Sequence, residues 1–336
     1  MSDESNKAGH FDSVDNVLKN NAEYSMTNQQ IFCERGGTCY NGIMERNVKT
    51  PKRIAVTWHP SLEEARSMSA EIVAELKKHP VDHAESYSLN DKNFRAALRK
   101  GQFDLMIALG GDGTMLRAGK LGAPVQVPVM GVNLGHFGFL VETQRNEWRS
   151  RIGDLLSGNW ETDKRMMIHA EQYRDGKKLH TWEVLNDIVL ARALSMRPVH
   201  LFVHVNDIEL AEYVADGLIL STATGSTSYS QSVGGPILRP DMRNMLLTPI
   251  SPNLCVDRSL VLPDTDTITF TLGGNVEAII SPDGYEGDEL AFGDQVRARA
   301  SEHSAEFVRF EDKGVFYRNI TRYMQRNPTI GGVQRS

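Results

Sequence analysis

The sequence contains few cysteines, and they form no recognisable pattern. Its 336 residues include only Cys33, Cys39 and Cys255. No C-x-x-C pair is present, and no cluster of His or Cys residues nearby completes a metal site. An odd number of unpaired cysteines is typical of free thiols in a reducing compartment, so we expect a cytoplasmic protein.

Long apolar runs and an excess of positive charge are also missing. No apolar run approaches the roughly 18 residues of a membrane span, and the acidic, polar first residues resemble neither a secretory signal nor a transit peptide. The formal net charge of −6 argues against nucleic acid as a partner. Anionic substrates would therefore need a local positive site, because the overall field does not attract them.

The chain is long enough for two ordinary domains, and its composition changes along its length. Residues 1–50 are a polar extension without a clear apolar period. We expect an α/β domain over residues 51–148, a β-rich domain over residues 149–310 and a C-terminal tail over residues 311–336 that can return to the α/β domain.

Strand-like and helix-like segments alternate in the first of these domains. Short apolar runs predict buried strands over residues 54–58, 105–109 and 127–132. Helical spacing predicts helices over residues 62–76, 91–100, 114–121 and 143–157. Ser61 and Glu64 have the spacing of a capping box at the start of the first helix. The alternation indicates a Rossmann-like parallel sheet.

From Lys164 to about Phe310, strand-like runs are separated by residue pairs that favour tight turns. The pairs are Asp175-Gly176, Asn206-Asp207 and Gly274-Asn275. Strands joined by such short turns pair in antiparallel fashion. The second half is therefore predicted to be a mostly antiparallel β-sandwich.

A glycine-rich motif, Gly110-Gly111-Asp112-Gly113-Thr114, directly follows the predicted strand 105–109. Ligands bind at the carboxyl ends of parallel strands, where glycines let the backbone approach a phosphate and a following helix offers free N–H groups. The carboxylate of Asp112 would repel a phosphate, which indicates a base for a hydroxyl nucleophile or an anchor for Mg²⁺. An ordinary strand-to-helix turn capped by Asp112 is the alternative.

Two polar segments of the second half have the composition of a ligand site. The stretch 216–230 leads from a strand into a loop rich in Ser and Thr. Such a loop can bind ribose, phosphate or the edge of a base, and Tyr229 can stack on a ring; a flexible loop is the alternative. Asn186-Asp187 interrupts a buried run and needs partners, either from a ligand or from the backbone at a β-bulge.

These motifs, in this order, resemble the NAD kinase family. The similarity covers about residues 53–300 and runs through GGDGT at 110–114, NLGHFGFL at 133–140, Asn186-Asp187, DGLILSTATGSTSYS at 216–230, GGPI at 234–237 and LTPISP at 247–252. GGDGT alone also occurs in phosphofructokinases and in diacylglycerol and sphingosine kinases, which lack the other motifs. The resemblance implies a phosphofructokinase-like α/β domain followed by a β-sandwich.

The resemblance also implies roles for individual residues. Asp112, flanked by Gly111 and Gly113, would activate the 2′-hydroxyl of the adenosine ribose of NAD. Gly113 and Arg117 would lie beside the bound dinucleotide. Adenine and ribose would be held by Asn186 and Asp187. Further contacts to the adenosine and nicotinamide portions would come from Asp216, Thr227, Ser228, Tyr229, Ser230 and Ser232, and from Arg197.

The implied reaction converts NAD to NADP, with ATP or inorganic polyphosphate as the phosphoryl donor and Mg²⁺ or another divalent cation accompanying it. No residue is assigned as a protein ligand to the metal. The family pattern also implies a homodimer or homotetramer. Asp187 stands where the family usually has Glu, and Asn253 stands where many members have His. A lipid or sugar kinase of the GGDGT type and a non-catalytic dinucleotide sensor are the alternatives.

Overall fold

The computed structural model describes residues 50–320, apart from residues 136–137, 195, 254–255, 275, 286, 313 and 319. The expected polar extension, except Thr50, and all three cysteines lie outside the described residues, as does the tail from residue 321 onward. In the described part of the chain, no helix has both the length and the apolar character needed to cross a membrane.

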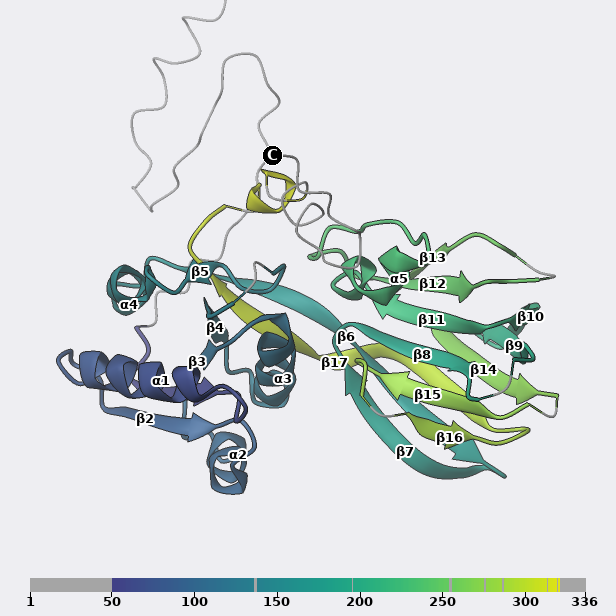
Figure 1. Ribbon diagram of the computed structural model, residues 1–336, viewed down its shortest axis with the longest axis horizontal. Helices are drawn as coiled ribbons and strands as arrows, with labels where there is room; N and C mark the ends of the chain where they lie inside the picture. The colour runs from purple at the N-terminus through teal and green to yellow at the C-terminus, as the bar shows by residue number, and fades with distance from the viewer. Residues whose placement is uncertain are drawn as a thin grey trace, which may run out of the picture. The chain divides into compact units, whose positions relative to one another are not determined.

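The first part of the chain is a three-layer α/β arrangement (Figure 1). Its parallel strands, in sheet order, are β2 (His83–Ser88), β1 (Arg53–Trp58), β3 (Leu105–Leu109) and β4 (Val129–Asn133). One face of the sheet packs on α1 (Glu63–Leu76) and α4 (Trp148–Leu156). The other face packs on α2 (Lys92–Arg99) and α3 (Asp112–Gly122), and the short helix η1 (Ala123–Val125) follows α3. Apolar residues on both faces of β1, β3 and β4 explain this double covering.

Two local predictions in this part are corrected by the structure. The hydroxyl of Ser61 bonds the Nδ1 atom of His59 at 2.6 Å, so α1 begins after Leu62 without a side-chain cap. The helix predicted over residues 143–157 is present as α4 but begins only at Trp148, because the short strand β5 (Thr143–Gln144) precedes it. The first residues of that segment pair with β4 instead, where Val132 lies opposite Thr143.

The second part of the chain is built from two sheets packed face to face. The larger sheet continues with β6 (Glu161–Arg174), β7 (Lys177–Val184), β9 (Val199–Val205), β10 (Ile208–Ala215), β14 (Thr267–Gly273) and β17 (Gln295–Arg309). The smaller sheet is wholly antiparallel and contains β8 (Asp187–Arg192), β11 (Gly217–Thr222), β12 (Asn244–Ile250), β13 (Leu260–Pro263), β15 (Ala278–Pro282) and β16 (Asp288–Leu290). Their facing side chains form one buried core. The predicted fold class is confirmed.

One strand joins the two parts. β17 pairs in antiparallel fashion with β14 and β6, and its Phe307 pairs in parallel fashion with Val129 of β4. Helix α3 packs closely against the same strand, because a Cβ on Gly119 would lie 2.8 Å from the ring of Phe307. The α/β part and the sandwich therefore share a continuous sheet of eleven strands.

Candidate active site

The carboxylate of Asp112 is held by the loop that follows β4. Asp112 is the first residue of α3, after Gly111, and it is half-buried. Its Oδ2 accepts the amide N–H of Phe139 at 2.8 Å, and its Oδ1 accepts that of Leu140 at 3.0 Å. A Cβ on Gly138 would overlap this carboxylate, so the loop approaches Asp112 closely only because residue 138 is glycine. The GGDGT motif and the NLGHFGFL stretch at 133–140 thus meet at one carboxyl group.

Burial raises the pKa of Asp112 above its ordinary value. The two amide N–H groups and the positive charges of Arg309 and Arg165 oppose this shift without cancelling it. A carboxylate held in this way is a better proton acceptor than a fully solvated one, because its conjugate acid is weaker.

A chain of buried charged side chains connects two loops. One is the loop after β4 that holds Asp112, here called the Asp112 loop; the other is the Ser- and Thr-rich loop after β11, here called the hydroxyl-rich loop. Arg309 donates to the carbonyl of Leu140 at 2.9 Å and lies 3.4 Å from Asp163. Asp163 also pairs with Arg165 at 2.6 Å, and Arg165 in turn donates to the hydroxyl of Thr224 at 3.3 Å. Burial alone would raise the pKa of Asp163, but the two arginines hold it below its ordinary value.

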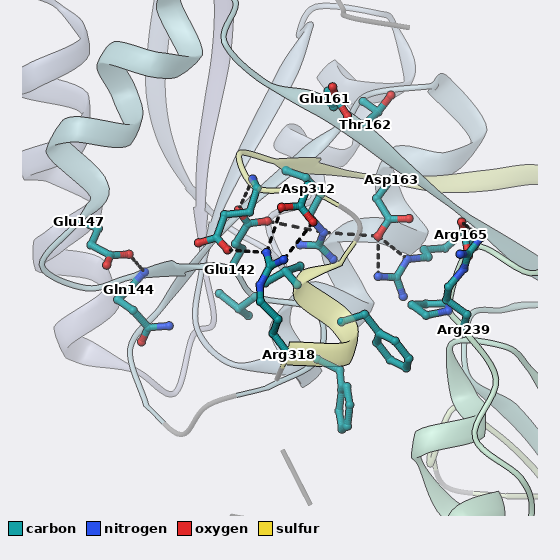
Figure 2. Close-up of a pocket in the computed structure, with 18 residues that line it drawn as sticks. Glu142, Gln144, Glu147, Glu161, Thr162, Asp163, Arg165, Arg239, Asp312 and Arg318 are labelled. Carbon is teal, nitrogen blue, oxygen red and sulfur yellow. Dashed lines mark hydrogen bonds and ion pairs between the residues drawn. The ribbon is translucent and has the colours of Figure 1, made fainter. Parts of the chain in front are cut away.

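These charges line a cavity of about 330 Å³ next to the Asp112 loop. Figure 2 shows Glu142, Asp163 and Arg165 along it, with Asp312 and Arg318 from the segment after β17. Glu142 accepts the backbone N–H groups of Phe310 and Glu311 at 3.0 and 2.9 Å, and burial raises the pKa of Glu142. The end of β17 is thereby fixed beside the loop that holds Asp112.

The Asn186-Asp187 pair marks the point where the chain passes from one sheet to the other. β7 of the larger sheet ends at Val184, and β8 of the smaller sheet begins at Asp187. The pair therefore does not form the β-bulge that was one reading of the sequence. The carbonyl of Asn186 accepts the N–H of Thr222 at 2.9 Å. The change of sheet accounts for polar residues within an otherwise apolar run.

Asp187 itself is buried, at 4% exposure, and its Oδ2 atom has no hydrogen-bond partner among the described residues. Burial and the nearby charge of Asp283 raise its pKa to about 7, against the effect of the Ser228 hydroxyl and the Tyr229 backbone. A buried carboxyl oxygen without a donor is costly and points to a missing partner. The position can therefore accept a hydrogen bond from a ligand.

The hydroxyl-rich loop is ordered, and the flexible-loop alternative is wrong. Its helical turns are η2 (Gly225–Thr227) and α5 (Tyr229–Ser232). A Cβ on Gly225 would overlap the backbone of Asn186, so this glycine lets the loop lie directly on the β7–β8 junction. The loop therefore presents a fixed set of hydroxyl groups.

These hydroxyl groups divide into an inner and an outer set. The inner ones are buried and bonded within the protein: Thr222 to the carbonyl of Leu185, Ser226 to that of Ala223, and Ser230 to the hydroxyl of Thr248. Ser230, a predicted contact residue, thus has a structural partner. The outer residues, which remain accessible, are Thr227, Ser228, Tyr229 and Ser232.

Not all of the predicted site residues meet in one place. Arg117 lies further along α3, where its Nη1 atom is 2.8 Å from Nε2 of His59, and Gly113 is exposed in the first turn of that helix. Asp216 precedes β11 at the end opposite the hydroxyl-rich loop and pairs with Arg192 at 2.8 Å. Arg197 is exposed in the connection between β8 and β9. Within a single chain, Asp216 and Arg197 are separate from Asp112 and its neighbours.

Asp283 is a further site residue that the sequence reading missed. Its side chain is fully buried, and it accepts hydrogen bonds from Lys120 of α3 at 2.7 Å and from the N–H of Asn186 at 2.7 Å. It thus ties α3 to the β7–β8 junction. Arg165 and Arg309 were missed as well. Arg309 lies between Val308 and Phe310, and a charged residue within an apolar run is the signal that marks it.

Comparison with known proteins identifies the family of the chain. The N-terminal domain of ATP-NAD kinase matches residues 28–160, and its C-terminal domain matches residues 185–310. The chain belongs to the NAD kinase family. The family resemblance drawn from the sequence is therefore confirmed, and the chain is classed with the enzymes of this family.

Individual relatives cover most of the chain. The NAD kinase of Chloroflexus aurantiacus is 34% identical over 278 residues, which span 82% of this chain and 99% of that protein. The NAD kinase of Heliobacterium modesticaldum is 36% identical over 245 residues, or 73% of this chain and 84% of that protein. Among solved structures, yeast NADH kinase in complex with NADH has a TM-score of 0.73 and 26% identity, and the match covers 82% of this chain and 89% of the yeast one.

A second solved structure confirms the fold alone. An NAD kinase from Archaeoglobus fulgidus, in complex with ATP, has a TM-score of 0.66 at 22% identity, over 82% of this chain and 99% of that one. Among the described residues, no group of three or more His, Cys, Asp or Glu side chains is placed to hold a metal ion. Mg²⁺ does not need such a cage, because it commonly binds through one or two carboxylates and substrate phosphates.

Proposed function

We propose that the chain transfers the terminal phosphoryl group of a nucleoside triphosphate to the 2′-hydroxyl of the adenosine ribose of NAD, which gives NADP. The observation that carries this proposal is the setting of Asp112, a carboxyl group with a raised pKa at the start of α3, held by two amide N–H groups. Such a group can accept the proton of an attacking hydroxyl. Membership of the NAD kinase family supports the choice of substrate.

The acceptor NAD would lie against the β7–β8 junction and the outer hydroxyl groups. Asn186 and Asp187 would hold adenine and ribose. The unpartnered Oδ2 atom of Asp187 supports this role, because ribose hydroxyls are donors that would satisfy it. Thr227, Ser228, Tyr229 and Ser232 would line the rest of the acceptor site. Because Asp is one methylene shorter than the Glu usual in the family, a water can fill the gap to the ribose.

The donor would meet the first turn of α3. The free N–H groups of this turn, at Gly111 and Gly113, favour phosphate oxygens. Phosphoryl transfer depends on positioning and on neutralising the negative charge of the phosphates. Mg²⁺ bound to the donor phosphates would supply part of that neutralisation, and Asp112 would take the hydroxyl proton.

We also propose that the protein works in the cytoplasm as a homodimer or homotetramer. The small number of cysteines and membership of the NAD kinase family support these two points. Size-exclusion chromatography with light scattering on the full chain measures the assembly directly, and a single monomer mass would contradict it.

The deciding experiment for the activity is product formation by the purified chain. The chain is incubated with NAD, ATP and Mg²⁺, and NADP is measured with a dehydrogenase specific for it. The Asp112→Asn variant, purified in the same way, controls for kinases of the expression host. We expect NADP from the wild-type chain and about 10² to 10⁴ times less from the variant.

Parallel arms separate the alternatives. NADH in place of NAD tests the acceptor range, which the NADH bound to the yeast relative makes worth measuring. NAD binding in calorimetry without any NADP formation would indicate a dinucleotide sensor and contradict the proposal. Phosphorylation of a diacylglycerol or a sugar instead of NAD would indicate a different GGDGT-type kinase.

A further inference from the structure

A second cleft, of about 620 Å³, lies between α2 and α3 on one side and β7 and the end of β15 on the other. It opens at the carboxyl ends of two parallel strands. Leu89 and Asn90 line the cleft and directly follow β2. His59 follows β1 and contacts Arg117, which also lines the cleft. In an open α/β sheet, this edge is where ligands bind. A volume of this size suits a small molecule such as a nucleotide.

Two arginines in the cleft are held by neutral groups. Arg95 donates to the carbonyl of Leu89 at 3.0 Å and to the side chain of Asn90 at 3.4 Å. Arg117 contacts Nε2 of His59 at 2.8 Å, and burial together with the charge of Arg117 lowers the pKa of that histidine, which favours its neutral form. Within the described part of the chain, neither guanidinium contacts a carboxylate. Each is therefore fixed in place without its charge being neutralised.

Two of the three other charged residues of the cleft are paired by their own contacts. Lys120, the third cation, pairs with the buried Asp283 at 2.7 Å. Of the two acidic residues in the lining, Glu183 is bonded to Nδ1 of His169 at 2.7 Å, and Asp288 lies on β16. The two guanidinium groups are thus the cations that no carboxylate of the described residues pairs with, against the single remaining carboxylate of Asp288. Guanidinium groups suit phosphate because their planar fork matches two phosphate oxygens.

An aromatic surface lies beside these cations. Tyr285 is 42% exposed, and the guanidinium carbon of Arg117 and Nζ of Lys120 lie 5.8 and 5.2 Å from the centre of its ring. Half-buried Trp182 lines the same cleft. A ring next to phosphate-binding cations is the combination that a nucleotide needs.

The cleft is close to Asp112 but distinct from the proposed acceptor site. Arg117 follows Asp112 by five residues on α3, which corresponds to about 7.5 Å along the helix axis. No residue of the hydroxyl-rich loop lines the cleft. A molecule bound here would therefore approach Asp112 from a different side than NAD held at Asn186 and Ser228.

We propose that this cleft binds the phosphate chain of the phosphoryl donor through Arg95, Arg117 and Lys120, with Tyr285 against the base when the donor is a nucleotide. Arg117 is thereby assigned to the donor, whereas the family resemblance placed it beside NAD. This inference rests on the proposed function. The ribose 2′-oxygen forms a bond to the terminal phosphorus, the bond from that phosphorus to the bridging oxygen breaks, and the donor leaves one phosphate shorter. The hydroxyl proton goes to Asp112. This cleft supplies the local positive site that a chain of net charge −6 requires.

The kinetic test uses Arg95→Gln, Arg117→Gln and a matched control. Arg99→Gln removes the same charge from α2, one turn beyond Arg95, at an exposed residue outside the cleft. We expect KM for ATP to rise about tenfold or more in each cleft variant, because a hydrogen bond to a charged group is lost, while KM for NAD changes less than about twofold. The control should match the wild type. Unchanged KM for ATP in both cleft variants would overturn the proposal.

A binding test distinguishes failure of the cleft as a phosphate site from failure of the proposed NAD kinase activity. Inorganic tripolyphosphate is titrated into the wild-type chain and Arg117→Gln by calorimetry, without NAD. Binding that is lost in the variant supports the cleft even if the wild type makes no NADP, which would defeat only the proposed function. Equal tripolyphosphate binding by both proteins would contradict phosphate binding in this cleft. Arg117→Lys, which keeps the charge but not the fork, serves if Arg117→Gln is poorly folded.

A third variant distinguishes the two sources of the phosphate chain. Tyr285→Leu removes the ring but no charge. For a nucleoside triphosphate donor we expect KM for ATP to rise severalfold, with tripolyphosphate binding unchanged. If inorganic polyphosphate is the donor, the variant should leave both values unchanged, and polyphosphate should replace ATP in NADP formation. A lower affinity for tripolyphosphate in Tyr285→Leu than in the wild type would contradict the assigned role of Tyr285.

Discussion

The Nη1 atom of Arg309 donates a hydrogen bond to the carbonyl oxygen of Leu140 at 2.9 Å. The backbone N–H of Leu140 in turn donates to Oδ1 of Asp112 at 3.0 Å. A residue at the end of the last strand thus holds the loop that presents its amide groups to the proposed base. Because Arg309 also pairs with Asp163, the orientation of this loop depends on the sandwich as well as on the α/β part.

Replacing Arg309 with Met should move the pH dependence of turnover. The charge of Arg309 lowers the pKa of Asp112, and the fixed Leu140 amide does the same, so losing both should raise that pKa. The acidic limb of the kcat profile should therefore move to higher pH, and turnover at pH 7 should fall. Arg318→Met, which removes a charge from the same cavity without touching Leu140, is the control. A uniform fall at every pH would mean that Arg309 acts only on stability.

Replacing Asp112 with Asn should abolish the proton acceptor while keeping the shape of the side chain. We expect kcat to fall by about 10² to 10⁴ and KM for NAD to stay near the wild-type value. The amide nitrogen must also face one of the two N–H groups of Phe139 and Leu140, so the free energy of unfolding should fall by about 1–3 kcal/mol. Steady-state kinetics and denaturant unfolding measure the two effects. Turnover near the wild-type level would remove Asp112 from its role.

Replacing Gly225 with Ala should push the hydroxyl-rich loop away from the β7–β8 junction, because the new Cβ would overlap the backbone of Asn186. We expect KM for NAD to rise tenfold, on the order of the loss of one good polar contact, and stability to fall by about 1–3 kcal/mol. Gly153→Ala is the matched control. Its Cβ has open space in α4, so it should stabilise the protein by about 0.5–1 kcal/mol and leave KM unchanged. The same KM in both variants would contradict the close approach.

Replacing Asp187 with Asn should change how stability depends on pH. The pKa of Asp187 rises from 3.8 in a solvated chain to about 7 in the folded protein. Between these values the folded state keeps a proton that the unfolded state has lost, so this residue's contribution to stability falls as pH rises toward 7. The loss is on the order of 4 kcal/mol, at about 1.36 kcal/mol per pKa unit. Asn does not titrate.

The measurement is the free energy of unfolding of both proteins from pH 4.5 to pH 8. The wild type should lose stability relative to Asp187→Asn across this range. Parallel curves would show that Asp187 ionises with an ordinary pKa. NAD added at pH 8 should stabilise the wild type more than the variant, because ribose donors would meet the ionised carboxylate.

The sequence correctly predicted those elements that are determined by residues adjacent to one another in the chain. Five apolar residues followed by Gly-Gly-Asp-Gly are enough to predict β3 and the start of α3, and the turn at Asp175-Gly176 adopts the positive φ angles that such pairs favour. The Ser61–Glu64 capping box failed because His59, two residues earlier, bonds the serine hydroxyl first. The roles of Asp112, Asn186 and the outer hydroxyls stay predictions, although the structure places them at two connected junctions.

What local sequence did not predict depends on contacts between distant residues. The run around Asn186 reads as one strand, and only the pairing of β7 and β8 with different partners shows that the chain changes sheets there. Asp283 and Asn186 are hydrogen-bonded although they lie 97 residues apart in the sequence, and Arg309 and Leu140 are hydrogen-bonded at a separation of 169 residues. Such pairs are set by how the sheets stack, and the residues adjacent to one partner in sequence do not indicate which residue is the other.

The continuity of β17 limits how the enzyme can move. It pairs with β14 over Gln295–Arg299, with β6 on both sides of a register shift between Ala300 and Ser304, and at Phe307 with β4 of the parallel sheet. A rotation of one half against the other would bend this strand and strain the ladders on both sides of it. Shielding of the reacting groups from water must then come from the substrates and from small shifts of loops and side chains, without a hinged closing of two lobes.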